Sequence, residues 1–206
     1  MSATNENHLI PAFSPLVYLL TSDETSLLEG ESPTAPQVSD LVKQAVRALL
    51  RAGGHKPSGR GRPASETLLK SFEEGRYPAI HPVVDHFNNI SLTSGLPISV
   101  LDADKMEGAW SFRLGRADES YLFNPSGQEL KLTGLLLLED RLGPAGTPVK
   151  DAQRTKVSSE TTRFFVVVWG TAVLDERLEK IHSQITRWTD ANGIDCQALL
   201  YERESV

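Results

Sequence analysis

Six cations lie in one stretch of the sequence, between Asp40 and Glu66, that contains no acidic residue. Three of them are spaced by four residues, and this spacing places side chains on one face of a helix. Lysine and arginine bind phosphate groups, so the stretch favours a local RNA-binding surface. A solvated helix face balanced by acids elsewhere explains it equally well. The six are Lys43, Arg47, Arg51, Lys56, Arg60 and Arg62.

A second polar run, residues 150–162, leads directly into the most apolar stretch of the chain, Phe164 to Trp169. Polar residues at the mouth of a buried strand often line a binding site. A polar approach to a hairpin accounts for the run equally well. We therefore keep both interpretations at this point.

The usual catalytic signatures of fixed spacing are absent. The loop Gly59-Arg60-Gly61 lacks the spacing that aims backbone N–H groups at a nucleotide. His81 and His86 are five residues apart and so lie on different faces of a helix. Cys196 is the only cysteine. The sequence therefore predicts no structural zinc site and no cofactor.

The composition is that of a globular protein, with 39% hydrophobic and 23% charged residues among 206. No apolar run reaches the roughly 18 residues that a membrane span requires. The N-terminus has no basic start before an apolar region, so we expect a cytoplasmic protein without a secretory signal. The formal net charge is −6, so any RNA contact must come from a local patch.

Helices come first, strands follow, and a helix and a strand come last, which predicts an α+β fold. We expect Phe164 to Trp169 in the core sheet, covered by helices near 83–94 and 174–190. We expect residues 38–206 to form the domain and 1–37 to be an appendage that packs part of Pro15 to Leu20. The expected helices are 38–51, 64–74 with Ser65 as its cap, 82–94 and 174–190; the expected strands are 98–101, 109–114, 120–123, 135–139, 162–169 and 194–201.

Several short motifs follow one another between residues 60 and 190. With them the chain resembles the B3/B4 domain of the phenylalanyl-tRNA synthetase beta subunit, and more closely the free-standing proteins built on that domain. The resemblance implies a mixed or antiparallel sheet packed by helices. The motifs are Arg62-Pro63, His81-Pro82-Val83-Val84-Asp85-His86-Phe87-Asn88-Asn89, Ser91 to Ile98, Asp102-Ala103-Asp104-Lys105, and Arg154-Thr155-Lys156-Val157 with Thr161-Thr162.

In the synthetases this domain hydrolyses tRNA that carries tyrosine, in a cleft between sheet and helix. The resemblance places the pocket asparagine at Asn88 and implies Phe87, Ser99 and Thr162 as further pocket residues. Ser99 stands where the synthetase motif has a histidine, and Val167 aligns near a glutamate. An apolar pocket rejects an added hydroxyl only weakly. These two departures therefore argue against tyrosine-specific editing, although they leave the fold and a ligand cleft intact.

Three functions remain open. The first is a stand-alone module that binds tRNA or another RNA through the basic patch. The second is a trans-editing hydrolase of mischarged tRNA, which could rely on the ribose hydroxyls of the substrate and an ordered water. The third is a small-molecule-binding protein with an amino-acid-like ligand in the cleft, which the net charge favours. A synthetase catalytic domain does not fit beside this one, so we do not expect a ligase.

Overall fold

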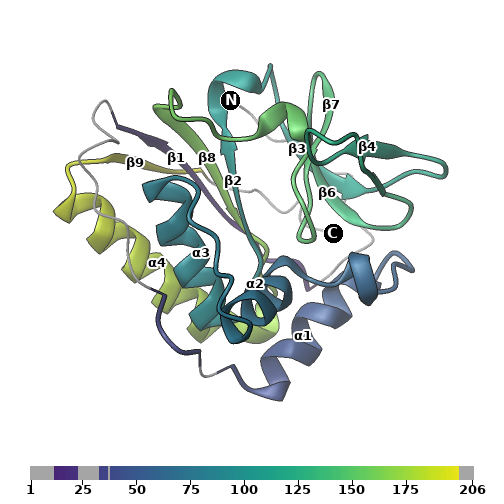
Figure 1. Cartoon of the computed structure of the whole chain (residues 1–206), viewed down its shortest axis with the longest axis horizontal. Helices are drawn as coiled ribbons and strands as arrows, with labels where there is room; N and C mark the ends of the chain where they lie inside the picture. The colour runs from purple at the N-terminus through teal and green to yellow at the C-terminus, as the bar shows by residue number, and fades with distance from the viewer. Residues whose placement is uncertain (1–11, 23–32, 37, 200–206) are drawn as a thin grey trace.

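A four-stranded antiparallel sheet lies between the two longest helices and a second, smaller sheet (Figure 1). The structure is a computed structural model that describes residues 12–22, 33–36 and 38–199. The strand order is β2-β8-β1-β9, and every neighbouring pair is antiparallel. The α+β class predicted from the sequence is therefore confirmed. The strands are β1 (Leu16–Thr21), β2 (Ile98–Asp102), β8 (Arg163–Val168) and β9 (Asp195–Leu199).

Strand β1 places the segment Leu16–Thr21 inside the large sheet. It lies between β8 and β9, with Leu16 opposite Val168 and Thr21 opposite both Arg163 and Asp195. An interior strand contributes hydrogen bonds along both edges and side chains to both faces of the sheet. Within the stretch Pro15 to Leu20, which was expected to pack in part, Val17, Tyr18 and Leu20 are buried.

The second sheet has the order β3-β6-β7, and β4 and β5 form a separate pair. Strands β5 and β7 were not predicted. They have only three and four residues, and the Gly-Pro-Ala-Gly sequence of β7 is typical of a turn. The strands are β3 (Ser111–Leu114), β4 (Ser120–Leu122), β5 (Glu129–Lys131), β6 (Leu136–Asp140) and β7 (Gly143–Gly146).

The four predicted helices are present in the described residues. Helix α3 begins where His81 accepts a hydrogen bond from the backbone N–H of Val83, and it ends at Gly95 in the left-handed conformation. Ser65 does not cap α2, because the helix begins at Ala64, and its hydroxyl has no hydrogen-bond partner among the described residues. The helices are α1 (Asp40–Arg51), α2 (Ala64–Glu73), α3 (Pro82–Ser94) and α4 (Asp175–Ala191).

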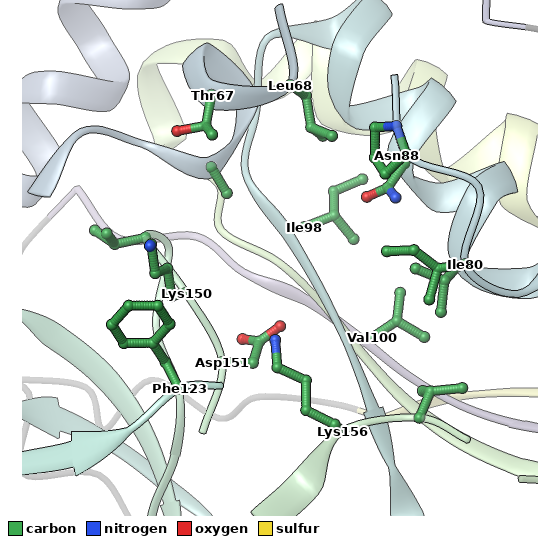
Figure 2. A pocket seen from close by; sticks show the side chains of 15 residues that line it. Thr67, Leu68, Ile80, Asn88, Ile98, Val100, Phe123, Lys150, Asp151 and Lys156 are labelled. Atoms are coloured by element: carbon green, nitrogen blue, oxygen red, sulfur yellow. The ribbon is translucent and has the colours of Figure 1, made fainter. Parts of the chain in front are cut away.

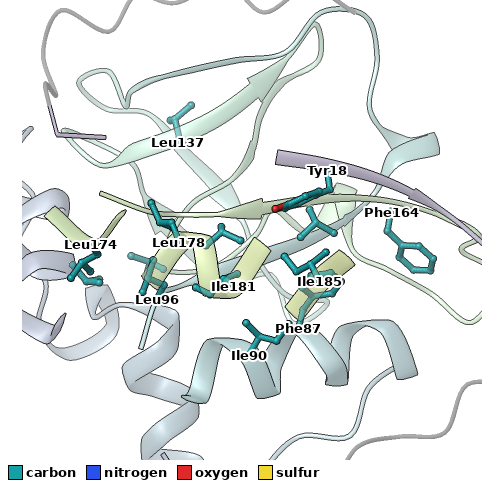
Figure 3. Close-up of a cluster of buried hydrophobic side chains, with 14 of the residues drawn as sticks. Tyr18, Phe87, Ile90, Leu96, Leu137, Phe164, Leu174, Leu178, Ile181 and Ile185 are labelled. Carbon is teal, nitrogen blue, oxygen red and sulfur yellow. The ribbon is translucent and has the colours of Figure 1, made fainter. Parts of the chain in front are cut away.

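Alternate residues of β8 face the two layers, as the period of a strand requires. Phe164, Val166 and Val168 pack against the helices, whereas Phe165 and Val167 pack towards the second sheet. Figure 3 shows the helix side, where α3 and α4 bring Phe87 and Ile181 to the sheet. The prediction that these two helices cover the strand is therefore confirmed. In the described part of the chain, no helix is long and apolar enough to cross a membrane.

Candidate functional site

A pocket of about 260 Å³ lies beside β2, which is an edge strand of the large sheet. Helices α2 and α3 form one wall, and the segment 149–157 forms the opposite one (Figure 2). Most of the lining is apolar, with a few polar groups, which is typical of a small-molecule site. The lining residues are Ala64, Thr67, Leu68, Pro78, Ile80, Val84, Asn88, Ile98, Val100, Phe123, Val149, Lys150, Asp151, Lys156 and Val157.

A tight turn positions the polar wall of the pocket. The hydroxyl of Thr147 donates to the carbonyl of Lys150 at 2.7 Å and accepts from its N–H at 3.1 Å. The Tyr121 hydroxyl also donates to this carbonyl. These bonds orient Lys150 and Asp151, the first two residues of the polar run, towards the pocket.

Arg154 anchors the rest of this wall to the second sheet. Its guanidinium makes two hydrogen bonds to Asp140, at 2.7 and 3.1 Å, and another to the carbonyl of Gly143. The side chain of Asp140 is only 1% exposed, so its carboxylate is shielded from water. Beyond Arg154, residue Lys156 pairs with Leu101 of β2 as an isolated bridge. The segment 151–157 is thereby held along the outer edge of β2.

Asp151 is the acidic side chain that lines the pocket. Its Oδ1 accepts a hydrogen bond from the Ser99 hydroxyl at 2.6 Å, and Ser99 in turn accepts one from the indole N–H of Trp169 at 2.9 Å. Burial raises the pKa of Asp151, while the charge of Lys156, the Ser99 hydrogen bond and a hydrogen bond from the backbone N–H of Thr147 oppose that rise. The carboxylate is thus fixed in direction but incompletely compensated in charge.

The raised pKa predicts how Asp151 affects stability. The folded protein holds this proton more tightly than the unfolded chain, whose pKa is near 3.8. The proton on Asp151 therefore contributes its full stabilisation at acidic pH, and this stabilisation is lost as the pH rises through the folded-state pKa. We expect Asp151→Asn to melt at a higher temperature than the wild type at pH 8, and the difference to shrink towards pH 4. Thermal melts across this range check it, with Asp104→Asn as control; a variant that is less stable at pH 8 would contradict it.

Three cations lie at or near the pocket. Lys150 and Lys156 line it, and the Lys150 ammonium lies 3.8 Å from the centre of the Phe123 ring. Burial lowers the pKa of Lys150, and the charges of Lys156 and Arg60 lower it further. Cations that repel one another form a surface suited to an anionic group. Arg60 belongs to the basic loop, whose continuation at Ala64 lines the pocket.

Of the four residues predicted for the pocket, one lines it, one reaches it indirectly and two do not line it. Asn88 lines the pocket, whereas Ser99 reaches it only through its hydrogen bond to Asp151. Phe87 is 1% exposed in the core, because consecutive helix residues point about 100° apart. Thr162 is not among the lining residues; its carbonyl accepts from the Ser22 N–H. We therefore remove Phe87 and Thr162 from the candidate site.

Ser99 and Val167, the two departures from the synthetase motif, are cross-strand partners. Both are buried, and Val167 belongs to the cluster between the sheets, with Trp169. The hydroxyl of Ser99 serves the Trp169 and Asp151 contacts. The two departures thus lie on the face of the large sheet opposite to Ile98 and Val100, which line the pocket.

The predicted basic patch is not one free surface. Arg47 makes a bidentate pair with Glu66 of α2, at 2.6 and 2.7 Å. Lys43 lies 3.8 Å from Asp40, and Arg62 donates to the carbonyl of Gly59. The remaining three cations, Arg51, Lys56 and Arg60, are exposed.

Other residues of the resemblance motifs hold the wall in place. The carboxylate of Asp102 binds Lys105 at 2.9 Å and accepts from the Thr161 hydroxyl at 2.8 Å. Lys105 also donates to the carbonyl of Lys156. These contacts join the end of β2 to the polar run, so these motif residues have a structural role.

Sequence reasoning did not single out Asp151, Lys150 or Lys156 individually. All three lie in the polar run 150–162, which was proposed to border a site. The signal that could have found Asp151 was its place between a lysine and an apolar residue, just before a segment with few other acids. Its partner Ser99 is 52 residues away, which no local pattern reveals.

The chain belongs to the B3/4 domain family, whose model matches residues 55–189. The resemblance seen in the motifs is therefore confirmed. A solved structure, an N-terminal fragment of the phenylalanyl-tRNA synthetase beta subunit from Pyrococcus horikoshii, is similar with 12% identity and a TM-score of 0.46. The match covers 82% of this chain and 42% of that chain, and so weak a likeness carries no functional argument. No curated protein matches the chain significantly.

Proposed function

We propose that the protein binds RNA that carries an amino-acid-like group, with tRNA as the natural class. The observation that carries the proposal is the position of the basic loop: Ala64, four residues after Arg60, lines the pocket and donates its backbone N–H to the carbonyl of Pro148 at 2.9 Å. A loop suited to phosphate thus adjoins a small, mostly apolar pocket. Membership of the B3/4 domain family supports this assignment. One ligand with an amino-acid group and a phosphate backbone would satisfy both parts.

The exposed cations predict the strength and salt dependence of RNA binding. Each phosphate contact contributes roughly 0.7 to 0.9 to the slope of log affinity against log salt. With few contacts and a net charge of −6, we expect affinity on the order of micromolar at physiological salt. The double variant Lys56→Ala/Arg60→Ala should bind all tRNAs more weakly, with a slope lower by roughly 1.5. Filter-binding or anisotropy titrations with bulk tRNA at several salt concentrations measure this.

Lys180→Ala is the matched control, because Lys180 is an exposed cation on α4, outside the proposed surface. Its slope and affinity should equal those of the wild type. If the wild type shows no salt-sensitive tRNA binding even at low ionic strength, the RNA proposal is wrong.

A free small molecule is the second candidate. The pairing of Arg47 with Glu66 removes one cation from the RNA surface, and a pocket of about 260 Å³ suits a single amino-acid-sized group. Binding of amino-acid amides without any tRNA binding would favour this candidate. A deacylation assay on mischarged tRNAs separately tests whether the site also hydrolyses the ester, as a trans-editing enzyme would.

A further inference from the structure

Asp151 has no direct salt-bridge partner in the described part of the chain. Lys156 is near enough to lower the pKa of Asp151, yet the ion pairs of the described residues do not include these two side chains. By contrast, Asp140, whose side chain is 1% exposed, is paired with Arg154 at 2.7 Å. A carboxylate removed from water is costly unless a cation and hydrogen bonds compensate it. The pocket therefore contains an acidic group whose direct counterion is missing.

The carboxylate is also preorganised. Ser99 binds Oδ1, and the Trp169 indole N–H fixes the Ser99 hydroxyl from the other side. Gly146 leaves room for the acid, since a Cβ there would lie 2.8 Å from Oδ1. A chain of hydrogen bonds that runs from a buried indole to a pocket acid holds that acid ready for a ligand at little cost in side-chain entropy.

The pocket is divided by polarity. Figure 2 shows the charged side chains of Asp151 and Lys156 on one side and the apolar side chains of Ile80, Ile98 and Val100, with the amide of Asn88, on the other. A ligand that matches this arrangement has a cationic group for the acid and an apolar group for the opposite wall. The cations at the mouth suit an anionic continuation of the same ligand.

We propose that Asp151 selects ligands by accepting a hydrogen bond from a protonated α-amino group. On this inference, which rests on the proposed function, the pocket admits aminoacyl groups with a free ammonium. It rejects N-acylated groups and hydroxy acids, because they lack the cation and leave the carboxylate uncompensated. A charge-assisted hydrogen bond of this kind accounts for a large difference in affinity.

Three amides of one side chain test the inference by calorimetric or NMR titration. Phenylalaninamide has the ammonium, N-acetylphenylalaninamide has it blocked, and 3-phenylpropanamide lacks the amino group. We expect the wild type to bind phenylalaninamide roughly ten- to hundredfold more tightly than the other two. Asp151→Asn should bind all three with similar, weak affinity. Asp104→Asn, an exposed acid paired with Arg163, should behave as the wild type.

The comparison of ligands on the wild type does not depend on how a variant folds. Equal affinity of the wild type for the three amides would overturn the inference, while the pocket and the proposed function would stand. Binding of none of them would also overturn it, and the tRNA titration then decides the proposed function separately. The inference would also be wrong if Asp104→Asn no longer distinguished the three amides while Asp151→Asn distinguished them as the wild type does.

Discussion

Replacement of Arg154 by alanine is expected to destabilise the protein by about 3 to 5 kcal/mol, because it leaves an enclosed carboxylate without its counterion. Asp140 is 1% exposed and would retain only the backbone N–H groups of Glu107 and Leu142 as donors. The change also frees the wall that carries Asp151 and Lys156, so ligand affinity should fall as well. The free energy of unfolding in urea measures the first effect.

Arg163→Ala is the matched control for this prediction. Arg163 also pairs with an aspartate, Asp104, but their side chains are 43% and 55% exposed. An exposed pair contributes about 0 to 1 kcal/mol. The double variant Arg154→Ala/Asp140→Ala should be less destabilised than the sum of the two single changes, because the orphaned charge is gone. A loss below about 1 kcal/mol in Arg154→Ala would contradict the anchoring role.

Gly134→Ala is expected to cost about 3 kcal/mol or more. Gly134 has a φ of +67°, which costs other residues about 1 to 2 kcal/mol, and its added Cβ would lie 1.9 Å from the backbone oxygen of Gly53. Overpacking against backbone adds about 1 to 3 kcal/mol. The contact joins the end of α1 to the second sheet, just before the loop with Lys56 and Arg60. A shift of Gly53 should therefore also weaken RNA binding.

Gly127→Ala is the control that separates backbone strain at a positive φ from steric overlap of the added Cβ. Gly127 has a φ of +77°, but no atom lies within 4 Å of an added Cβ. It should lose only the conformational part, about 1 to 2 kcal/mol. Denaturant melts of both variants give the comparison. If they are equally destabilised, the close backbone contact between Gly134 and Gly53 is not what requires glycine.

Local signals in the sequence identified the helices but not the arrangement of all strands. The Pro82 start and the Gly95 end delimit α3, and both are local chemical effects. The place of β1 depends on pairing with β8, about 145 residues away, which no short window contains. Strands β5 and β7 are too short to show a period.

The candidate site shows the same limit. The neighbours Phe87 and Asn88 were both expected in the pocket, but helix geometry turns one into the core and the other to the pocket wall. The basic stretch was evident, whereas the neutralisation of Arg47 by Glu66 required the packing of α1 against α2. The role of Asp151 could not be predicted, because its hydrogen-bond partner Ser99 and the next residue in the chain of hydrogen bonds, Trp169, lie far from it in the sequence.

The central claim is that the pocket and the basic loop around Arg60 form one site for RNA that carries an aminoacyl group. An anisotropy titration at low salt tests it most directly, with a tRNA acceptor stem ending in a stable phenylalanyl amide and the same stem uncharged. We predict that the wild type binds the phenylalanyl stem roughly tenfold more tightly. Lys56→Ala/Arg60→Ala should weaken both stems and keep their difference. Equal affinity for the two stems, or binding of neither, would contradict the account.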